Sequence, residues 1–216
     1  MSIRIFGSSH IAGNYANRIS DIIITEEPDI VAVELDALRA QSLFSKSHKF
    51  NFAAARKMGV FGFLFAYIGS KIQKALGNTV GFEPGVDMKK AMLAARKANS
   101  KILLIDRDFR ITMKRLSNIK FSEKLKLVLS IVFAPFDKTN KAIMNELDKV
   151  PNENTIEKML VLFKKRFPEM YDVLVEERNI YMAKNLKSIE KKYPHAEIFA
   201  VIGAGHKKRI HELLKN

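Results

Sequence analysis

The sequence predicts an α/β fold with a mainly parallel central sheet, flanked by helices and extended by helical insertions. Two observations lead to this prediction. Short runs rich in Ile, Val and Ala alternate along the chain with stretches whose apolar residues recur at helical spacing. The run 30–35 is almost continuously apolar, which is typical of a parallel strand covered on both faces. With 216 residues, the chain is long enough for one well-buried core, so we expect a single domain over 1–216.

The first strand–helix–strand unit lies near the N-terminus. Residues 3–6 are β-branched or aromatic at three of four positions, and the strand that they predict ends at Gly7. Apolar residues at helical spacing over 11–23 predict a helix that ends before Pro28, and 30–35 forms the next strand. A short connection of this kind makes the two strands parallel, with a right-handed crossover.

The same pattern recurs toward the C-terminus. A stretch rich in Ala and Met predicts a helix over 84–98, and the strand 101–105 follows it. A long helix over 169–192 precedes the strand 198–202, and 207–214 forms the terminal helix.

Two helical insertions, at about 38–78 and about 111–167, separate these units. Their apolar side chains, such as Phe61, Phe65 and Phe133, add considerable apolar area to a small domain. Three interpretations stay open for this area: packing within the core, a homodimer contact, or a peripheral contact with a membrane. Of the last two, we favour the homodimer.

Composition excludes several classes of site. The chain has no cysteine, which excludes disulfides, thiolate catalysis and zinc sites built from Cys. The sequence begins directly with a strand-like run, without the features of a secretion signal. The longest apolar run, 60–68, is well short of the roughly 20 residues of a membrane-spanning helix. We therefore expect a cytoplasmic protein.

The charge of the chain is strongly positive. The 37 Lys and Arg outnumber the 23 Asp and Glu, which gives a formal net charge of +14. Such a charge attracts anionic membranes, nucleic acids and acidic substrates alike. Because no helix-turn-helix, zinc-finger or RNP-like pattern accompanies the lysines, we do not expect nucleic-acid binding.

Polar residues follow four of the predicted strands, at the positions where ligands bind in open parallel sheets. Two of these strand ends share the pattern G-x-x-H, in which glycine permits a sharp turn and the histidine lies near the start of the next helix. The four ends are Gly7 to His10, Glu34 with Asp36, Asp106 to Asp108, and Gly203 to His206. The matching first and last ends predict that His10 and His206 share one pocket.

Two imidazoles with one or two carboxylates form a ligand set suited to Zn, Mn, Co or Fe. Water bound to such a metal becomes a nucleophile near neutral pH. Without a metal, one histidine would act as a general base and a nearby glutamate would orient it. Both versions predict hydrolysis or a related transfer reaction, and neither requires an organic cofactor.

Each charged candidate also has a purely structural interpretation. Glu34 lies in an apolar strand, where its carboxylate needs a cationic partner, either a metal or a salt bridge to Arg39 or Arg107. Glu83 precedes a predicted helix, where an acidic residue is favoured for its charge alone. These alternatives stay open.

The same choice applies to two arginines. Arg107, between Asp106 and Asp108, would either clamp an anionic group or hold its loop in a cluster of ion pairs. Glu177 projects into the apolar face of the long helix, and Arg178 lies at the edge of that face. This pair forms either a structural bridge or part of a pocket, and we favour the pocket.

Five segments, in this order, resemble the TraB family, which includes the pheromone-shutdown protein PrgY: GSSH, VAVELDALR, GFEPGVDMKKAMLAARKANSKILLIDRDFRITMKRL, VEERNIYMAKNL and VIGAGHKKRI. Through its paired G-x-x-H motifs the chain also resembles the wider group of Tiki metalloproteases, erythromycin esterases and ChaN-like proteins. The resemblance implies an α/β core with a site made of several charged residues. The implied metal ligands and catalytic residues are His10, Glu34, Glu83 and His206, with Arg107 and Arg178 as further catalytic residues and Arg39 and Arg115 as supporting charges.

The Tiki branch implies peptide cleavage that depends on a divalent metal, with Mn, Co or Zn as the candidates. TraB proteins often carry a C-terminal membrane region, whereas this sequence ends at Asn216, so we expect a soluble form. Two functions fit the motifs. One is a metal-dependent hydrolase that acts on peptides, and the other is a noncatalytic protein that captures a peptide or a small anionic ligand in the same arginine-lined pocket.

Overall fold

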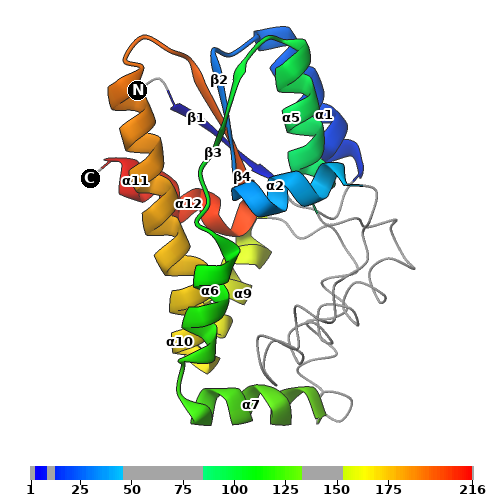
Figure 1. The fold of residues 1–216 in the computed structure, drawn as a ribbon. Coiled ribbons are helices and arrows are strands. Elements are labelled where there is room, and N and C mark those ends of the chain that lie inside the picture. The colour runs from blue at the N-terminus through cyan, green and yellow to red at the C-terminus, as the bar shows by residue number, and fades with distance from the viewer. Residues whose placement is uncertain (1–2, 9–12, 46–84, 133–152, 216) are drawn as a thin grey trace.

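Among the residues that the structure describes, four parallel strands form the centre of the fold, in the order β1-β4-β2-β3. The structure is a computed structural model that describes residues 3–8, 13–45, 85–132 and 153–215. The parallel sheet of an α/β fold, predicted from the sequence, is thus confirmed. The strands are β1 (Ile3–Ser8), β2 (Ile30–Val33), β3 (Lys101–Leu104) and β4 (Ile198–Gly203) (Figure 1).

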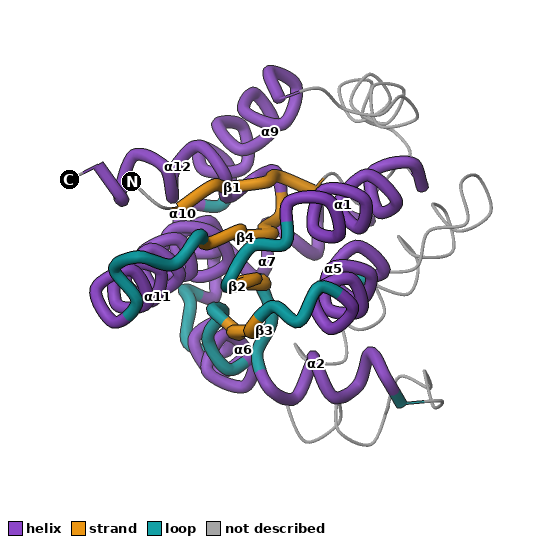
Figure 2. The backbone as a smooth tube through the Cα atoms, turned by 90° about the horizontal axis from the view of Figure 1, so that it is seen from above, coloured by secondary structure: helices purple, strands orange, loops and turns teal. Residues whose placement is uncertain are grey.

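Helices cover both faces of this sheet (Figure 2). α1 and α5 pack on one face, and α11 and α12 pack on the other. A π-helical turn joins α10 to α11. The helices are α1 (Gly13–Glu26), α2 (Ala37–Phe44), α5 (Val86–Lys97), α6 (Phe109–Ser117), α7 (Phe121–Val132), α9 (Glu153–Arg166), α10 (Pro168–Tyr171), the π-helical turn (Asp172–Glu176), α11 (Glu177–Lys192) and α12 (Ala204–Lys215).

Among the element boundaries that differ from those predicted, two lie within the G-x-x-H segments. β1 continues to Ser8, because Gly7 and Ser8 still pair with Ile202 and Gly203 of β4. The last helix begins at Ala204, directly after β4, instead of at residue 207. The second G-x-x-H segment therefore contains the end of a strand and the first turn of a helix.

Alternation along β2 decides where the residue after it points. Val31 and Val33 pack with α1 and α5, whereas Ile30 and Ala32 pack with α11 and α12. All four side chains are buried. Because successive side chains of a strand point to opposite faces, Glu34 is directed toward α11 and α12 at the carboxyl end of the sheet.

Part of the second expected insertion packs as a separate small core. Leu116 at the end of α6 is buried against Phe167 and Met170 near α10. Residues 46–78 of the first expected insertion and 133–152 of the second lie outside the described residues.

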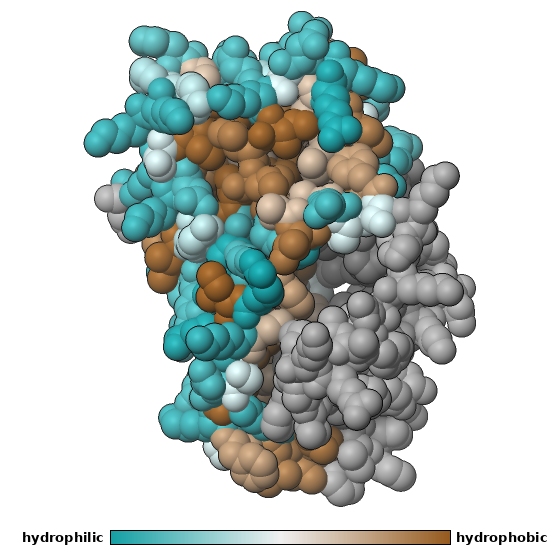
Figure 3. Space-filling view, in the orientation of Figure 1, coloured by the Kyte–Doolittle hydropathy of each residue, from teal (hydrophilic) through white to brown (hydrophobic). Residues whose placement is uncertain are grey.

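Apolar surface gathers on the face of the molecule where β3 forms an edge of the sheet (Figure 3). Leu104, in this strand, is 37% exposed. The homodimer expected from the sequence stays a prediction. Within the described ranges, none of the helices combines the length and the apolar character that a membrane span requires.

Phe199→Ala should destabilise the protein strongly. Phe199 is only 2% exposed, and its ring centroid lies 6.1 Å from that of Phe6. We expect the free energy of unfolding, measured in urea, to fall by about 3–5 kcal/mol, because the truncation leaves a cavity. Phe121→Ala removes a ring that is 71% exposed and should cost about 0.5 kcal/mol or less. Equal losses in the two variants would contradict this packing.

Candidate functional site

Glu34 lies where β2 leaves the sheet. Its backbone N–H donates to the carbonyl of Val201 at 3.1 Å, which extends the pairing of β2 with β4 by one residue. Its carboxylate accepts a hydrogen bond from the Gly203 N–H, with 2.6 Å between Oε2 and the nitrogen. Because Glu34 is 7% exposed, backbone groups of β4 fix both its main chain and its side chain in a nearly dry position.

His206 approaches the other oxygen of the same carboxylate. The histidine lies in the first turn of α12, and its Nε2 is 3.4 Å from Glu34 Oε1. Arg178 Nη1 lies 3.3 Å from the same nitrogen. The ends of β2 and β4 thus bring together two of the four predicted ligands.

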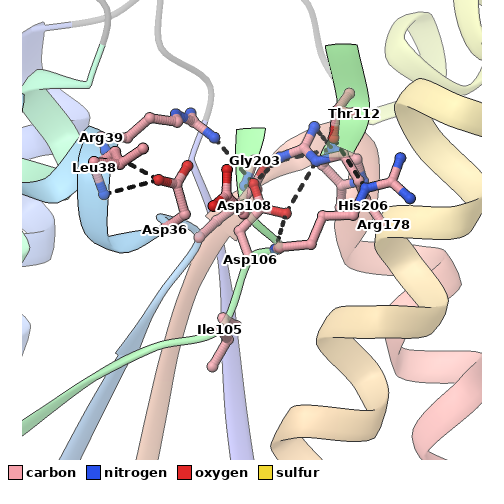
Figure 4. Close-up of polar contacts among 12 residues, drawn as sticks. Asp36, Leu38, Arg39, Ile105, Asp106, Asp108, Thr112, Arg178, Gly203 and His206 are labelled. Atoms are coloured by element: carbon pink, nitrogen blue, oxygen red, sulfur yellow. Dashed lines mark hydrogen bonds and ion pairs between the residues drawn. The ribbon is translucent and has the colours of Figure 1, made fainter. Parts of the chain in front are cut away.

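Arg178 connects Glu34 with Asp106, the second residue after β3. Figure 4 shows the side chains of Arg39, Asp106, Arg178 and His206 in this cluster. It donates to Glu34 Oε1, and its Nε and Nη2 donate to the two Asp106 oxygens at 3.1 and 2.7 Å. Arg39, from α2, donates to the Asp106 carboxylate at 2.9 Å. Two carboxylates therefore face two guanidiniums, and groups from three strand ends and three helices meet in one cluster.

The environment determines which form each group takes at neutral pH. Burial by itself raises the pKa of the Glu34 carboxyl, but positive charge at His206 and Arg178 and the hydrogen bond from Gly203 lower it to about 2. Burial also lowers the pKa of His206, because it disfavours the imidazolium; Glu34 opposes this effect and Arg178 adds to it. At neutral pH the pair therefore consists of an ionised carboxylate and a neutral imidazole, and Arg178 supplies the positive charge that Glu34 needs. The imidazolium contributes only once acidification has protonated His206.

Arg107 belongs to a neighbouring set of contacts. Its Nη1 donates to Glu177 Oε2 at 2.6 Å, and its Nε donates to Thr112 Oγ1 at 2.9 Å. Its Nη2 donates to the Val173 carbonyl at 2.6 Å. Arg115 pairs with the second oxygen of Glu177. These contacts hold the loop after β3 against the π-helical turn and α11.

Two of the predicted ligands, His10 and Glu83, lie outside the described residues. The strand that leads to His10 is described up to Ser8, which pairs in register with Gly203 at the end of β4. The two G-x-x-H segments therefore leave the sheet from adjacent strands. That His10 and His206 share a pocket stays a prediction.

The motifs did not single out Asn179, whose side-chain oxygen lies 2.7 Å from His206 Nδ1. The sequence contains a signal for it. Asn179 has helical spacing with Met182, Ala183 and Leu186, which are all buried. An amide therefore falls on the buried face of α11, where a polar group needs a partner.

Glu34 and His206 suit a divalent metal in chemistry and in spacing. A carboxylate and a neutral imidazole are the forms that bind Zn, Mn or Co. Glu34 Oε1 and His206 Nε2 are 3.4 Å apart, which is compatible with two bonds of about 2.0–2.2 Å to one ion. Among the described residues, no group of three or more His, Asp or Glu side chains forms a metal site. Further ligands would come from other residues, such as His10 and Glu83.

Comparison with known proteins relates the whole chain to one family. A family model described as the TraB/PrgY/gumN family matches residues 1–216. The chain is 34% identical over 218 residues to an uncharacterized protein of Methanocaldococcus jannaschii, covering 99% of this chain and 53% of that protein. It is 22% identical over 230 residues to the TraB domain-containing proteins of Mus musculus and Homo sapiens, covering 94% of this chain and 60% of each relative. The chain thus spans between half and two thirds of the length of these relatives.

Acidification tests the ionisation of Glu34. The pKa in the folded protein, about 2, lies below the ordinary value of 4.5, so the ionised carboxylate stabilises the fold above about pH 4.5. This contribution is lost as the pH falls toward 2, and Glu34→Gln has no such contribution to lose. We expect the difference in unfolding free energy between wild type and variant to shrink by on the order of 3 kcal/mol from about pH 5 to about pH 2. Urea unfolding at each pH measures it, and a constant difference would rule out the depressed pKa.

Proposed function

The chain belongs to the TraB/PrgY/gumN family, and we propose that it is a metal-dependent hydrolase that cleaves peptide bonds at the carboxyl end of the sheet. One observation carries this proposal: Glu34 Oε1 and His206 Nε2 lie 3.4 Å apart at the ends of paired strands. The directions of both pKa shifts favour the forms of these groups that bind metals. In this proposal, His10 and Glu83 complete the ligand set.

The residues of the chain would then have distinct roles. A bound divalent metal, with Mn, Co and Zn as the candidates, would supply a water acidic enough to lose a proton near neutral pH. Glu34 and His206 would hold the ion, while the Gly203 N–H keeps the carboxylate in place. Arg178 and Arg39 would offer positive charge to the carboxylate of a peptide or to the oxygen on which negative charge develops.

A cavity of about 680 Å³ next to the first turn of α12 would accommodate a peptide. It lies between β1, α9 and α12, and its wall includes Gly205, directly before His206, whereas Glu34, Arg178 and His206 themselves do not line it. Ile5 from β1 and Ile156 and Leu160 from α9 give it an apolar lining. β1 is an edge strand of the described sheet, and edge strands bind extended peptides through their backbone groups.

A noncatalytic binding protein is the second candidate, and the position of Arg178 favours it. Arg178 donates to Glu34 Oε1 and lies 3.3 Å from His206 Nε2, so its guanidinium contacts both atoms that a metal would use. If this arrangement persists, Arg178 and Arg39 would serve to capture an anionic group, for which the forked guanidinium is well suited.

Metal binding tests the proposed hydrolase directly. Elemental analysis of protein purified without chelator, followed by calorimetric titration with Mn²⁺, Co²⁺ and Zn²⁺, should detect a bound divalent ion, and a peptide screen should give metal-dependent cleavage. His206→Ala and Glu34→Gln each remove a ligand. They should abolish cleavage and weaken metal binding by more than the roughly 10- to 100-fold typical of a change outside the ligand set.

Matched variants make this test specific. His211→Ala is the control, because His211 lies on the same helix as His206 and is exposed; it should bind metal as the wild type does. His10→Ala and Glu83→Gln extend the test to the two ligands outside the described residues. If the four ligand variants all bind metal normally, the site is assigned wrongly.

Arg178→Gln distinguishes the two functions. In the hydrolase, losing the guanidinium frees both donor atoms and removes a like charge from beside the ion, so metal affinity should rise about tenfold or more. If the chain is a binding protein, neither the wild type nor Arg178→Gln takes up metal, and Arg178→Gln loses affinity for anionic peptides. Calorimetric titration measures both. Arg115→Gln is the control, because it removes the same charge from the neighbouring pair with Glu177, and an equal gain in that variant would point to net charge alone.

A further inference from the structure

Asn179 is completely buried, at 0% exposed, on the face of α11 that contacts α12. Its Oδ1 lies 2.7 Å from His206 Nδ1, and its Nδ2 lies 3.5 Å from Glu176 Oε2. We propose that Asn179 is a positioning residue that fixes His206 in the tautomer with the proton on Nδ1. Nε2, the nitrogen that faces Glu34 and Arg178, then keeps a free lone pair. The chemical use of that lone pair rests on the proposed function, whereas the tautomer itself does not.

The hydrogen-bond partners of Asn179 decide its orientation. An amide oxygen only accepts, so an oxygen facing Nδ1 requires a proton on that nitrogen, and the neutral ring then has none on Nε2. The amide NH₂ group meanwhile faces the Glu176 carboxylate, which accepts. Exchanging the two amide atoms would place the oxygen beside that carboxylate, with two acceptors facing each other. The contacts on both sides of Asn179 therefore favour the same orientation.

Two groups face the other ring nitrogen. Arg178 Nη1 lies 3.3 Å from Nε2 and carries only donors, so a lone pair on Nε2 accepts from it. Glu34 Oε1, 3.4 Å from Nε2, would accept a proton from that nitrogen. It lies farther away than Asn179 Oδ1 does from Nδ1, and it already accepts from Arg178. The shorter contact, with Asn179, therefore selects the Nδ1–H form.

The π-helical turn helps to place Asn179. It lies directly before α11, and two of its carbonyls accept side-chain hydrogen bonds, from Arg107 to Val173 and from Arg178 to Leu174. These bonds fix the start of α11. Asn179 is thereby held toward α12 on a backbone that cannot readily rotate. Single π-helical turns of this kind occur often at functional sites.

The consequence concerns the nitrogen available for chemistry. A histidine that binds a metal through Nε2 usually donates its Nδ1–H to an oxygen, which fixes the ring and makes Nε2 a better ligand. A general base likewise needs an unprotonated Nε2. Asn179 would provide this oxygen in either mechanism.

Nitrogen-15 spectra of the imidazole rings in the metal-free protein at neutral pH test the inference, with His206→Ala used to assign the signals. In the wild type, Nδ1 of His206 should be protonated and Nε2 should not. Asn179→Leu, which removes the acceptor at nearly constant size, should convert a large fraction of the ring to the Nε2–H form.

Asn185→Ala is the matched control. Asn185 lies on the same helix, and its side-chain amide donates to the Ile105 carbonyl at 3.0 Å without contacting His206. This variant should leave the tautomer unchanged. A wild-type ring with the proton on Nε2, or an Asn179→Leu ring with unchanged populations, would overturn the inference.

Calorimetric titration with Mn²⁺ and Zn²⁺ separates this inference from the proposed function. If the wild type binds metal, Asn179→Leu should bind it about 10- to 100-fold more weakly, while Asn185→Ala binds normally. Equal affinities in the wild type and Asn179→Leu would overturn the positioning role. If the wild type binds neither metal, the proposed hydrolase fails, while the spectra still decide the role of Asn179.

Discussion

The buried ion pairs of Arg178 with Glu34 and Asp106 are the interaction on which the rest of the site depends. The side chains of these residues are 15%, 9% and 2% exposed, respectively. At such burial, a charge without a partner costs several kcal/mol, whereas a complete pair is close to neutral in free energy. The ends of β2 and β3 and the start of α11 must therefore come together as a unit, which places His206 beside the same carboxylate.

Much of the fold could be predicted from local patterns. The almost unbroken apolar run at 30–35 predicted a central strand, and β2 is buried at every position. The predicted helix over 84–98 corresponds to α5, Val86–Lys97, because Ala and Met form its buried face. Part of the candidate site could also be predicted. Glu34 and His206 both follow predicted parallel strands, and the carboxyl ends of parallel strands lie at the same edge of a sheet, so both residues were expected there.

The remaining features depend on contacts between distant segments or lack a local signal. Asp106 and Arg178 meet across 72 positions, and the sequence also offered Arg178 the neighbouring Glu177 as a partner. In the structure, Glu177 turns instead to Arg107 and Arg115. The predicted helix over 169–192 contains a π-helical turn at Asp172–Glu176. The sequence could not predict this turn, because the side chains of these residues are equally compatible with a regular helix.

The π-helical turn also determines which face of α11 points toward the sheet. A π-helical turn holds about one residue more than a regular turn of 3.6 residues, so it rotates the following helix by about 100° relative to the preceding one. Met170 before it and Val173 within it belong to the small core under α6, while Met182 beyond it packs on the main sheet and Asn179 contacts His206 of α12. Deleting one residue there would make the helix regular but would swing one of these two surfaces toward water. The segment is thus a spacer of fixed length, intolerant of insertions and deletions even where single side chains tolerate exchange.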